Sequence, residues 1–191
     1  MYDQLIHEIN KYIELDDADT EIVKALFIDR NLARGDYFLK AGDVCREIGF
    51  IHSGLIYYGV NTDGHETVHN FADEHSFVSN YDSLINQTPS VKDIVALEET
   101  RMLVITRGSL EEFYSRVNHG ERFGRLLIQE VYTNAIKQLL SFYNSDPETR
   151  YTEFVQRHPD LVQRIPQYYI ASFVGIKPQS LSRIRKRMAT L

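Results

Sequence analysis

Glycines are concentrated in one short part of this 191-residue sequence. Six of the ten lie between Gly35 and Gly64, at intervals of five to seven residues, and they separate short β-prone segments. Glycine at this spacing is typical of turns between short strands. Many short strands within about 75 residues favour a compact antiparallel roll or barrel over a parallel sheet.

The same segments predict where the individual strands lie. Asn61–Gly64 falls between two β-prone stretches and predicts a hairpin loop. Two helices, over residues 2–12 and 19–27, are expected before the roll. The expected strands include 37–39, 48–51, 55–60 and 66–71, with a further strand pair at 94–97 and 101–106.

A different pattern begins after Gly124, where glycines nearly cease. The apolar spacing lengthens from two residues towards 3.6, which predicts one long helix with two adjoining apolar stripes. We expect the roll to cover one stripe and a second copy of the helix to cover the other, in a twofold dimer with a coiled-coil-like contact. A helix wholly buried within a monomer is the alternative. The predicted dimer residues are Phe123, Leu127, Ile128, Val131, Tyr132, Ala135, Ile136 and Leu139, and Leu140, Phe142 and Tyr143 continue the stripes.

A new helix is predicted where the long one ends. Ser145 is a capping residue, Pro147 suits a first helical turn, and Glu148 follows three residues after the serine. This helix should run from Asp146 to about His158, where a proline follows. We therefore place a domain boundary at residue 145.

The segment from Gln167 to Arg187 has the pattern of a helix-turn-helix. Ala171 is small where two helices must approach closely, Gly175 can adopt the positive φ that the turn needs, and Pro178 suits the first turn of the second helix. A shared apolar seam turns polar residues of the second helix outward, towards a DNA major groove. The seam contains Ile170, Val174, Ile176, Leu181 and Ile184.

The side chains expected to contact DNA fall into two groups. Gln179, Ser180 and Arg183 are candidates for base contacts, because arginine suits guanine, glutamine suits adenine and serine is permissive. The remaining cations are expected to meet phosphates. The full set is Lys177, Gln179, Ser180, Ser182, Arg183, Arg185, Lys186 and Arg187. Few residues follow this helix, so no full β-hairpin wing is expected.

Charge is segregated along the chain, although the net charge is −6. From Arg164 to Leu191 there are six basic residues and no acidic residue, whereas the preceding chain holds all 27 acidic residues and 15 basic ones. A positive field at the second helix attracts phosphates, and acidity elsewhere discourages indiscriminate binding by the remaining surface.

Composition and motifs argue against several function classes. Cys45 is the only cysteine, which rules out an intrachain disulfide, a four-cysteine iron–sulfur cluster and a thiolate zinc site. His65 and His69 share one strand face but lack a third ligand, so no metal or other cofactor is expected. No apolar run could span a bilayer, which predicts a cytoplasmic protein without a membrane partner. No nucleophile–base pair, phosphate-binding loop or paired carboxylates can be recognised, so we do not expect an enzyme.

The order of these parts, a glycine-punctuated roll, a long helix and a helix-turn-helix, resembles the Crp-Fnr superfamily of bacterial transcription regulators. Arg34–Asp43, Phe50–Gly54 and Ala96–Glu98 resemble its cyclic-nucleotide-binding roll, and Ile170–Arg187 resembles its DNA-binding element. The resemblance implies an α+β fold. Its expected parts are an antiparallel β-roll of the cyclic-nucleotide-binding, jelly-roll type with flanking helices (1–118), a long linker and dimerisation helix (119–144), and an all-α helix-turn-helix domain (145–191).

Cyclic-nucleotide members of this superfamily carry a phosphate-binding cassette with a Gly-Glu pair and an Arg-Ser or Arg-Thr pair. Ser79-Asn80 and Ser90-Val91 stand in those places here. A cyclic phosphate would lose its guanidinium, whose bidentate grip a serine hydroxyl cannot replace, so cyclic AMP is not the expected ligand. Tyr81 belongs to a polar cluster that either binds a ligand or caps a short helix. The candidate pocket residues are Ser79, Asn80, Tyr81, Ser90 and Lys92.

The sequence thus predicts a homodimeric, sequence-specific DNA-binding transcription regulator that acts on an inverted-repeat operator. Double-stranded DNA is the main expected partner, and RNA polymerase and an unidentified small-molecule effector are left open as further partners. The alternative is a small-molecule or protein-interaction module of the same fold, whose C-terminal helices serve only as a packing domain.

Overall fold

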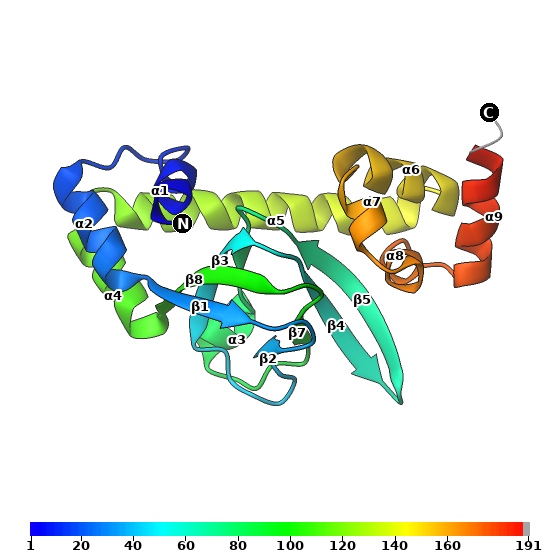
Figure 1. The fold of residues 1–191 in the computed structure, drawn as a ribbon, viewed down its shortest axis with the longest axis horizontal. Coiled ribbons are helices and arrows are strands. Elements are labelled where there is room, and N and C mark those ends of the chain that lie inside the picture. The colour runs from blue at the N-terminus through cyan, green and yellow to red at the C-terminus, as the bar shows by residue number, and fades with distance from the viewer. Residues whose placement is uncertain (189–191) are drawn as a thin grey trace.

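The computed structural model describes residues 1–188. Its N-terminal part contains two four-stranded antiparallel sheets, with strand orders β1-β8-β3-β6 and β2-β7-β4-β5. Figure 1 shows these sheets below the long helix α5, with a group of short helices at its C-terminal end. The strands are β1 (Ile28–Leu32), β2 (Tyr37–Leu39), β3 (Glu47–Ser53), β4 (Ile56–Thr62), β5 (His65–Ala72), β6 (Phe77–Val78), β7 (Asp93–Ala96) and β8 (Thr100–Thr106).

Helices flank the two sheets, which we call the roll, and continue beyond them. Helices α6 to α9 form a separate group that we call the head. The helices are α1 (Tyr2–Ile9), α2 (Asp17–Leu26), α3 (Tyr81–Asn86), α4 (Arg107–Arg116), α5 (Gly120–Asn144), α6 (Pro147–Arg157), α7 (Leu161–Arg164), α8 (Gln167–Phe173) and α9 (Pro178–Met188).

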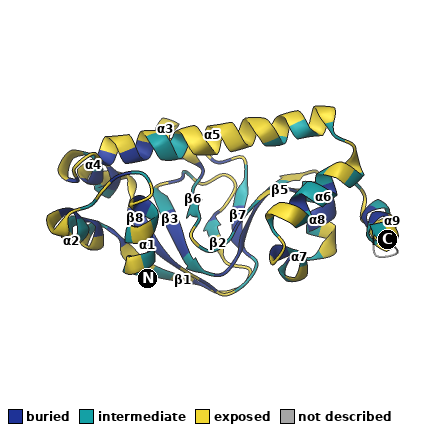
Figure 2. Cartoon of the chain, turned by 90° about the horizontal axis from the view of Figure 1, so that it is seen from above, coloured by how far each residue is buried: buried dark blue, intermediate teal, exposed yellow. Residues whose placement is uncertain are grey.

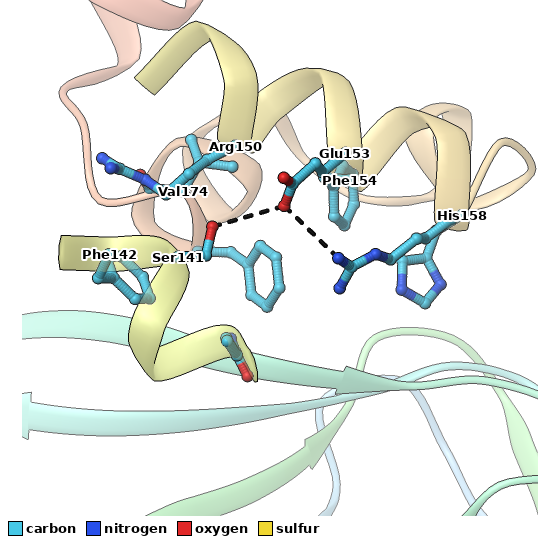
Figure 3. A pocket seen from close by; sticks show the side chains of 10 residues that line it. Ser141, Phe142, Arg150, Glu153, Phe154, His158 and Val174 are labelled. Carbon is cyan, nitrogen blue, oxygen red and sulfur yellow. Dashed lines mark hydrogen bonds and ion pairs between the residues drawn. The ribbon is translucent and has the colours of Figure 1, made fainter. Parts of the chain in front are cut away.

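The main core fills the roll and extends to the first turns of α5. Phe50 of β3, Met102 of β8 and Phe113 of α4 are at most 1% exposed. Phe123 of α5 joins this core through ring contacts with Phe113, at 5.6 Å between centroids. Full burial of one such side chain stabilises the fold by about 1.5–3 kcal/mol. Figure 2 shows buried residues in the strands and at the start of α5, whereas the rest of α5 is largely exposed.

The predicted α+β fold with an antiparallel roll is confirmed, but the strand pair predicted at 94–97 and 101–106 was wrong. Strand β7 pairs with β2 and β4, whereas β8 pairs with β1 and β3, so the two strands belong to different sheets. Residues 97–99 carry the chain from one sheet to the other. Strand β1 was not predicted, because only one of its five residues is buried and its apolar pattern is correspondingly weak.

The helix after α5 is confirmed, but it begins at Pro147, one residue later than predicted, and its cap is Asp146 instead of Ser145. The Asp146 carboxylate accepts the backbone N–H groups of Glu148 (2.9 Å) and Thr149 (3.0 Å), and Pro147 occupies the first turn. An aspartate immediately before a first-turn proline is placed to bond these otherwise unpaired donors. Residues 189–191, the end of the predicted domain 145–191, lie outside the described residues.

Candidate nucleic-acid interface

The turn between α8 and α9 has the geometry that the sequence predicted. Gly175 has φ of +73°, in the left-handed region. The N–H of Ile176 donates to the carbonyl of Ala171 (2.9 Å), and the N–H of Gly175 donates to that of Ser172 (3.0 Å). This pair of bonds is the Schellman arrangement that ends a helix at a glycine. Gly175 therefore stops α8 and redirects the chain into α9.

The two helices share the predicted apolar seam. Ile170, Val174, Leu181 and Ile184 are at most 5% exposed, and Ile176 is partly buried. Ala171 is fully buried at the close approach of the helices. The seam packs on Tyr151 and Phe154 of α6, on Leu161 and Ile165, and on Leu55 of the roll.

The opposite face of α9 is polar and open to solvent. Gln179, Ser182, Arg183 and Lys186 are exposed on it, and Lys177 is exposed immediately before it. Ser180 and Arg185 are partly buried at its edges. A helix with this face outward can present hydrogen-bond donors and positive charge to a DNA groove.

A depression beside this face involves a residue that the sequence did not single out. Gln167, at the start of α8, lines it together with Pro178, Ser182, Arg185 and Lys186. The first helix of a helix-turn-helix crosses the DNA backbone, so its N-terminal residues lie near phosphates. The position of Gln167 at the first residue of that helix was the signal that could have identified it.

Arg187 and Arg164, in the basic C-terminal segment, have acidic partners. The Arg187 guanidinium lies 2.5 Å from a carboxylate oxygen of Glu148, and both side chains are largely exposed. Exposed pairs of this kind are weak, so Arg187 can exchange this partner for a phosphate. Arg164 instead bonds Glu74 and Glu98 of the roll. Arg164 was counted among the cations of the basic segment, but it lies on α7, outside the second helix where the positive field was expected.

The long helix is covered at its start and uncovered along most of its length. Phe123 is buried and Leu127 is partly buried against the roll, as predicted for one stripe. From Val131 onward, however, both stripes are open: Tyr132 is 67% exposed and Leu139 is 50% exposed. The prediction that the roll covers one apolar stripe was therefore wrong beyond Leu127. The alternative, a helix wholly buried within a monomer, was also wrong. The open side, here called the outer face, comprises the partly buried Ile128 and the exposed Val131, Tyr132, Ala135, Ile136, Leu139, Leu140, Phe142 and Tyr143.

Two polar residues of the same helix bond other parts of the protein. Gln138 donates from Nε2 to the carbonyl of His69 (2.9 Å), and Tyr12 donates its hydroxyl proton to Glu130 (2.6 Å). A surface helix in a monomer normally has its apolar side inward, whereas the apolar outer face of α5 is open to solvent.

The residues at the expected cassette positions make hydrogen bonds within the chain. Asn80 and Ser90 are 3% and 4% exposed, and the Asn80 amide donates to the Ser90 hydroxyl (2.8 Å). That hydroxyl in turn donates to the Lys92 carbonyl (2.6 Å), and Ser79 donates to the Glu47 carbonyl (3.0 Å). These hydroxyl protons are therefore already used within the chain.

The two charged or aromatic members of the candidate pocket lie differently. The Lys92 ammonium is 6.0 Å from the ring centre of the buried Tyr58, and burial lowers the pKa of Lys92. Tyr81 is 40% exposed at the start of α3, beside Ile128 of α5. The structure thus brings Ser79, Asn80, Ser90 and Lys92 into one region and places Tyr81 outside it.

The part of the chain that the structure describes, residues 1–188, contains no group of three or more His, Cys, Asp or Glu side chains suited to a metal ion. None of its helices combines the length and apolar character that a membrane span requires.

The chain thus consists of a roll of two antiparallel sheets, a long helix and a head with a helix-turn-helix, in that order. Residues 29–117 match the family described as the cyclic nucleotide-binding domain. No curated protein sequence matches the chain significantly.

Solved structures of regulators share this fold at low sequence identity. FixK2 from Bradyrhizobium japonicum has a TM-score of 0.74 and 12% identity, over 86% of this chain and 85% of its own. The c-di-GMP-responsive global regulator CLP from Xanthomonas campestris has a TM-score of 0.69 and 14% identity, over 92% of both chains. A protein from Eubacterium rectale, described as a transcriptional regulator of the crp/fnr family, has a TM-score of 0.66 and 12% identity, over 92% of this chain and 84% of its own. The predicted resemblance to the Crp-Fnr superfamily is thus confirmed in the fold.

Proposed function

We propose that this protein is a homodimeric transcription regulator that reads an inverted DNA repeat with α9. The observation that carries this proposal is the exposed polar and cationic face of α9, held outward by the buried seam of a helix-turn-helix. The regulators among the structural neighbours support the same assignment. Gln179, Ser180 and Arg183 are the proposed base-contacting residues, and Lys177, Arg185, Lys186 and Arg187 are the proposed phosphate contacts.

The proposed dimer forms through the outer face of α5. Two copies of α5 packed on their apolar sides would remove the exposed Tyr132 and Leu139 from water. A twofold dimer of helix-turn-helix heads places its recognition helices in successive major grooves, about 34–36 Å apart. The operator should therefore be an inverted repeat with the same symmetry as the protein.

Selection of binding sites from random duplex DNA, at two salt concentrations and without added effector, tests the function. Recovery of an inverted repeat with steep salt dependence is the expected result, because several phosphate contacts release counterions. Absence of enrichment, also in the presence of cell extract, would instead favour an interaction module without DNA binding.

Substitutions at Arg183 and Lys186 should weaken DNA binding in different ways. Arg183→Ala should cost about 1–3 kcal/mol on the selected operator and relax the preference at one base position, because a bidentate contact to guanine is lost. Lys186→Ala should weaken binding to all sequences similarly and reduce the slope of log K against log salt by about 1. Fluorescence anisotropy on the operator, on single-base variants and on unrelated DNA measures both effects.

A matched control for these variants is Lys137→Ala on α5, which removes an exposed cation far along the chain from α9. It should leave operator affinity unchanged. Equal losses on every sequence for Arg183→Ala and Lys186→Ala would contradict the assignment of Arg183 to a base.

Cyclic AMP should not stabilise the protein. The Ser90 hydroxyl is already bonded within the chain, and the cassette lacks the arginine that a cyclic phosphate needs. A ligand present at 100 times its Kd would stabilise the fold by about 2.7 kcal/mol, which a thermal scan detects readily. A clear rise in Tm with millimolar cyclic AMP would contradict this prediction.

A further inference from the structure

The head is connected to the rest of the chain through α5, and it also packs directly on the roll of the same chain through α8. Figure 1 shows α8 beside β5. The Tyr169 ring stacks on that of Tyr57, with 4.7 Å between centroids, and the Phe173 ring contacts that of Phe71 at 5.5 Å. Aromatic pairs at such distances stabilise a contact beyond the area they bury.

Polar groups on the same surfaces are paired across the contact. The Val68 N–H of β5 donates to the Ser172 hydroxyl of α8 (2.8 Å). Tyr169 and Tyr57 donate their hydroxyl protons to the two oxygens of Glu66, at 3.0 and 2.8 Å. One carboxylate thus joins a tyrosine of the head to a tyrosine of the roll.

Arg164, at the end of α7, makes the charged part of the contact. Its guanidinium donates to both oxygens of Glu74 (2.9 and 2.9 Å) and to both oxygens of Glu98 (3.1 and 2.7 Å). The three side chains are about one third exposed or less. Planar, multiply bonded arginine–carboxylate contacts of this kind fix direction as well as distance.

The charges of Arg164 and Glu74 favour this contact at neutral pH. Burial raises the pKa of the Glu74 carboxyl, but hydrogen bonds from Arg164 and from the Gly54 N–H outweigh it and hold the pKa at about 2. The hydrogen bonds that Arg164 donates to Glu98 and Glu74 raise the pKa of its guanidinium. Both groups are therefore charged at neutral pH.

The contact between head and roll does not cover the exposed polar face of α9. Its residues in the head lie on α7 and α8, whereas Gln179 and Arg183 are exposed on α9. A head held through α7 and α8 therefore keeps a fixed orientation while α9 remains accessible.

From these contacts we infer that Arg164 and Tyr169 are positioning residues that hold each head on the roll of its own protomer and thereby set the half-site spacing that the dimer accepts. The inference rests on the proposed function. A rigid head reaches only one spacing, because each added base pair moves a half-site by about 3.4 Å and turns it by about a tenth of a helical turn. No effector is needed for this selectivity, since the contact is made within the chain.

The test compares operators whose half-site spacing changes one base pair at a time. The unmodified protein should prefer one spacing over its neighbours by about tenfold or more, and Arg164→Gln should reduce this preference to about threefold or less, because a released head can follow a displaced half-site. Arg164→Lys keeps the charge but cannot bond both carboxylates in this geometry, so it should lie between the two. Tyr169→Phe, which keeps the ring stacking and removes the bond to Glu66, should also lie between them.

The matched control is Arg157→Gln, which removes a mostly exposed arginine of α6 whose carboxylate partner, Glu153, lies in the same helix. It should keep the sharp spacing preference. Hydrogen exchange at the Val68 amide gives a second measurement that does not involve DNA. Its protection should fall in Arg164→Gln and stay unchanged in Arg157→Gln.

Each other outcome is informative. If Arg164→Gln keeps a sharp spacing preference and a protected Val68 amide, the positioning role is overturned. Tighter binding of this variant at the original spacing would also overturn it, because the contact would then be inhibitory. If the unmodified protein binds no duplex DNA, the proposed function fails and the positioning role fails with it. The Val68 exchange would then still show separately whether the head is held on the roll.

Discussion

Replacement of Leu139 by glutamate should leave the protein monomeric and weaken its binding to an inverted repeat by about 10²–10⁴-fold, the usual loss when two linked sites no longer act together. Leu139 is 50% exposed on the outer face of α5. In the proposed dimer this substitution places two unpaired carboxylates in an apolar contact, which costs several kcal/mol. The isolated protomer should keep its fold, because the side chain is already in contact with water and glutamate favours helix.

Sedimentation equilibrium and operator titration measure the two expected losses. Asn134→Glu is the matched control, because it adds the same charge to α5 at an exposed residue outside the outer face. That variant should remain a dimer and bind the operator normally. A Leu139→Glu protein that sediments as a dimer would show that the outer face is not the dimer contact.

Replacement of Gly54 by alanine should destabilise the roll by roughly 3 kcal/mol or more, from backbone strain and a steric clash together. Gly54 has φ of +113°, which alanine adopts only with strain. An added Cβ would lie 2.7 Å from the Cα of Thr100 and 2.8 Å from the carbonyl oxygen of Glu99. Backbone atoms cannot rotate away as a side chain can, so the strand connection must move.

Thermal unfolding measures this loss, and a change of 3 kcal/mol corresponds to a fall in Tm of about 6–12 °C for a chain of this size. Gly64→Ala is the matched control, because Gly64 also has a positive φ, +81°, but has nothing within 4 Å of an added Cβ. It should lose only about 1 kcal/mol through strain. Similar losses in both variants would show that the contact with Thr100 is not the cause.

The local parts of this structure could be predicted from the sequence because short-range chemistry decides them. Gly175 ends α8 in a left-handed turn, and Pro178 begins α9 as expected. The seam residues are buried because their spacing places them on one side of each helix. The outward face of α9, and hence the candidate site, follows from the same spacing.

The parts that depend on distant partners could not be predicted in the same way. The sequence predicts strands near 94–97 and 101–106, but nothing in the local sequence of either strand indicates which sheet it will join. Arg164 likewise seemed one more cation of a basic segment, and only the fold brings it to Glu74 and Glu98. The exposure of α5 beyond Val131 depends on where the roll ends, which apolar spacing does not encode.

The open apolar face of α5 has a consequence for the amount of protein a cell must make. Val131, Tyr132 and Leu139 are at least half exposed in the single chain, so a newly made chain would expose this apolar surface until it forms the proposed dimer. In that dimer, association removes the surface from water and stabilises both chains by mass action. Scarce copies would therefore be shorter-lived and more exposed to proteases than abundant ones, and the active form would accumulate more steeply than the rate of synthesis.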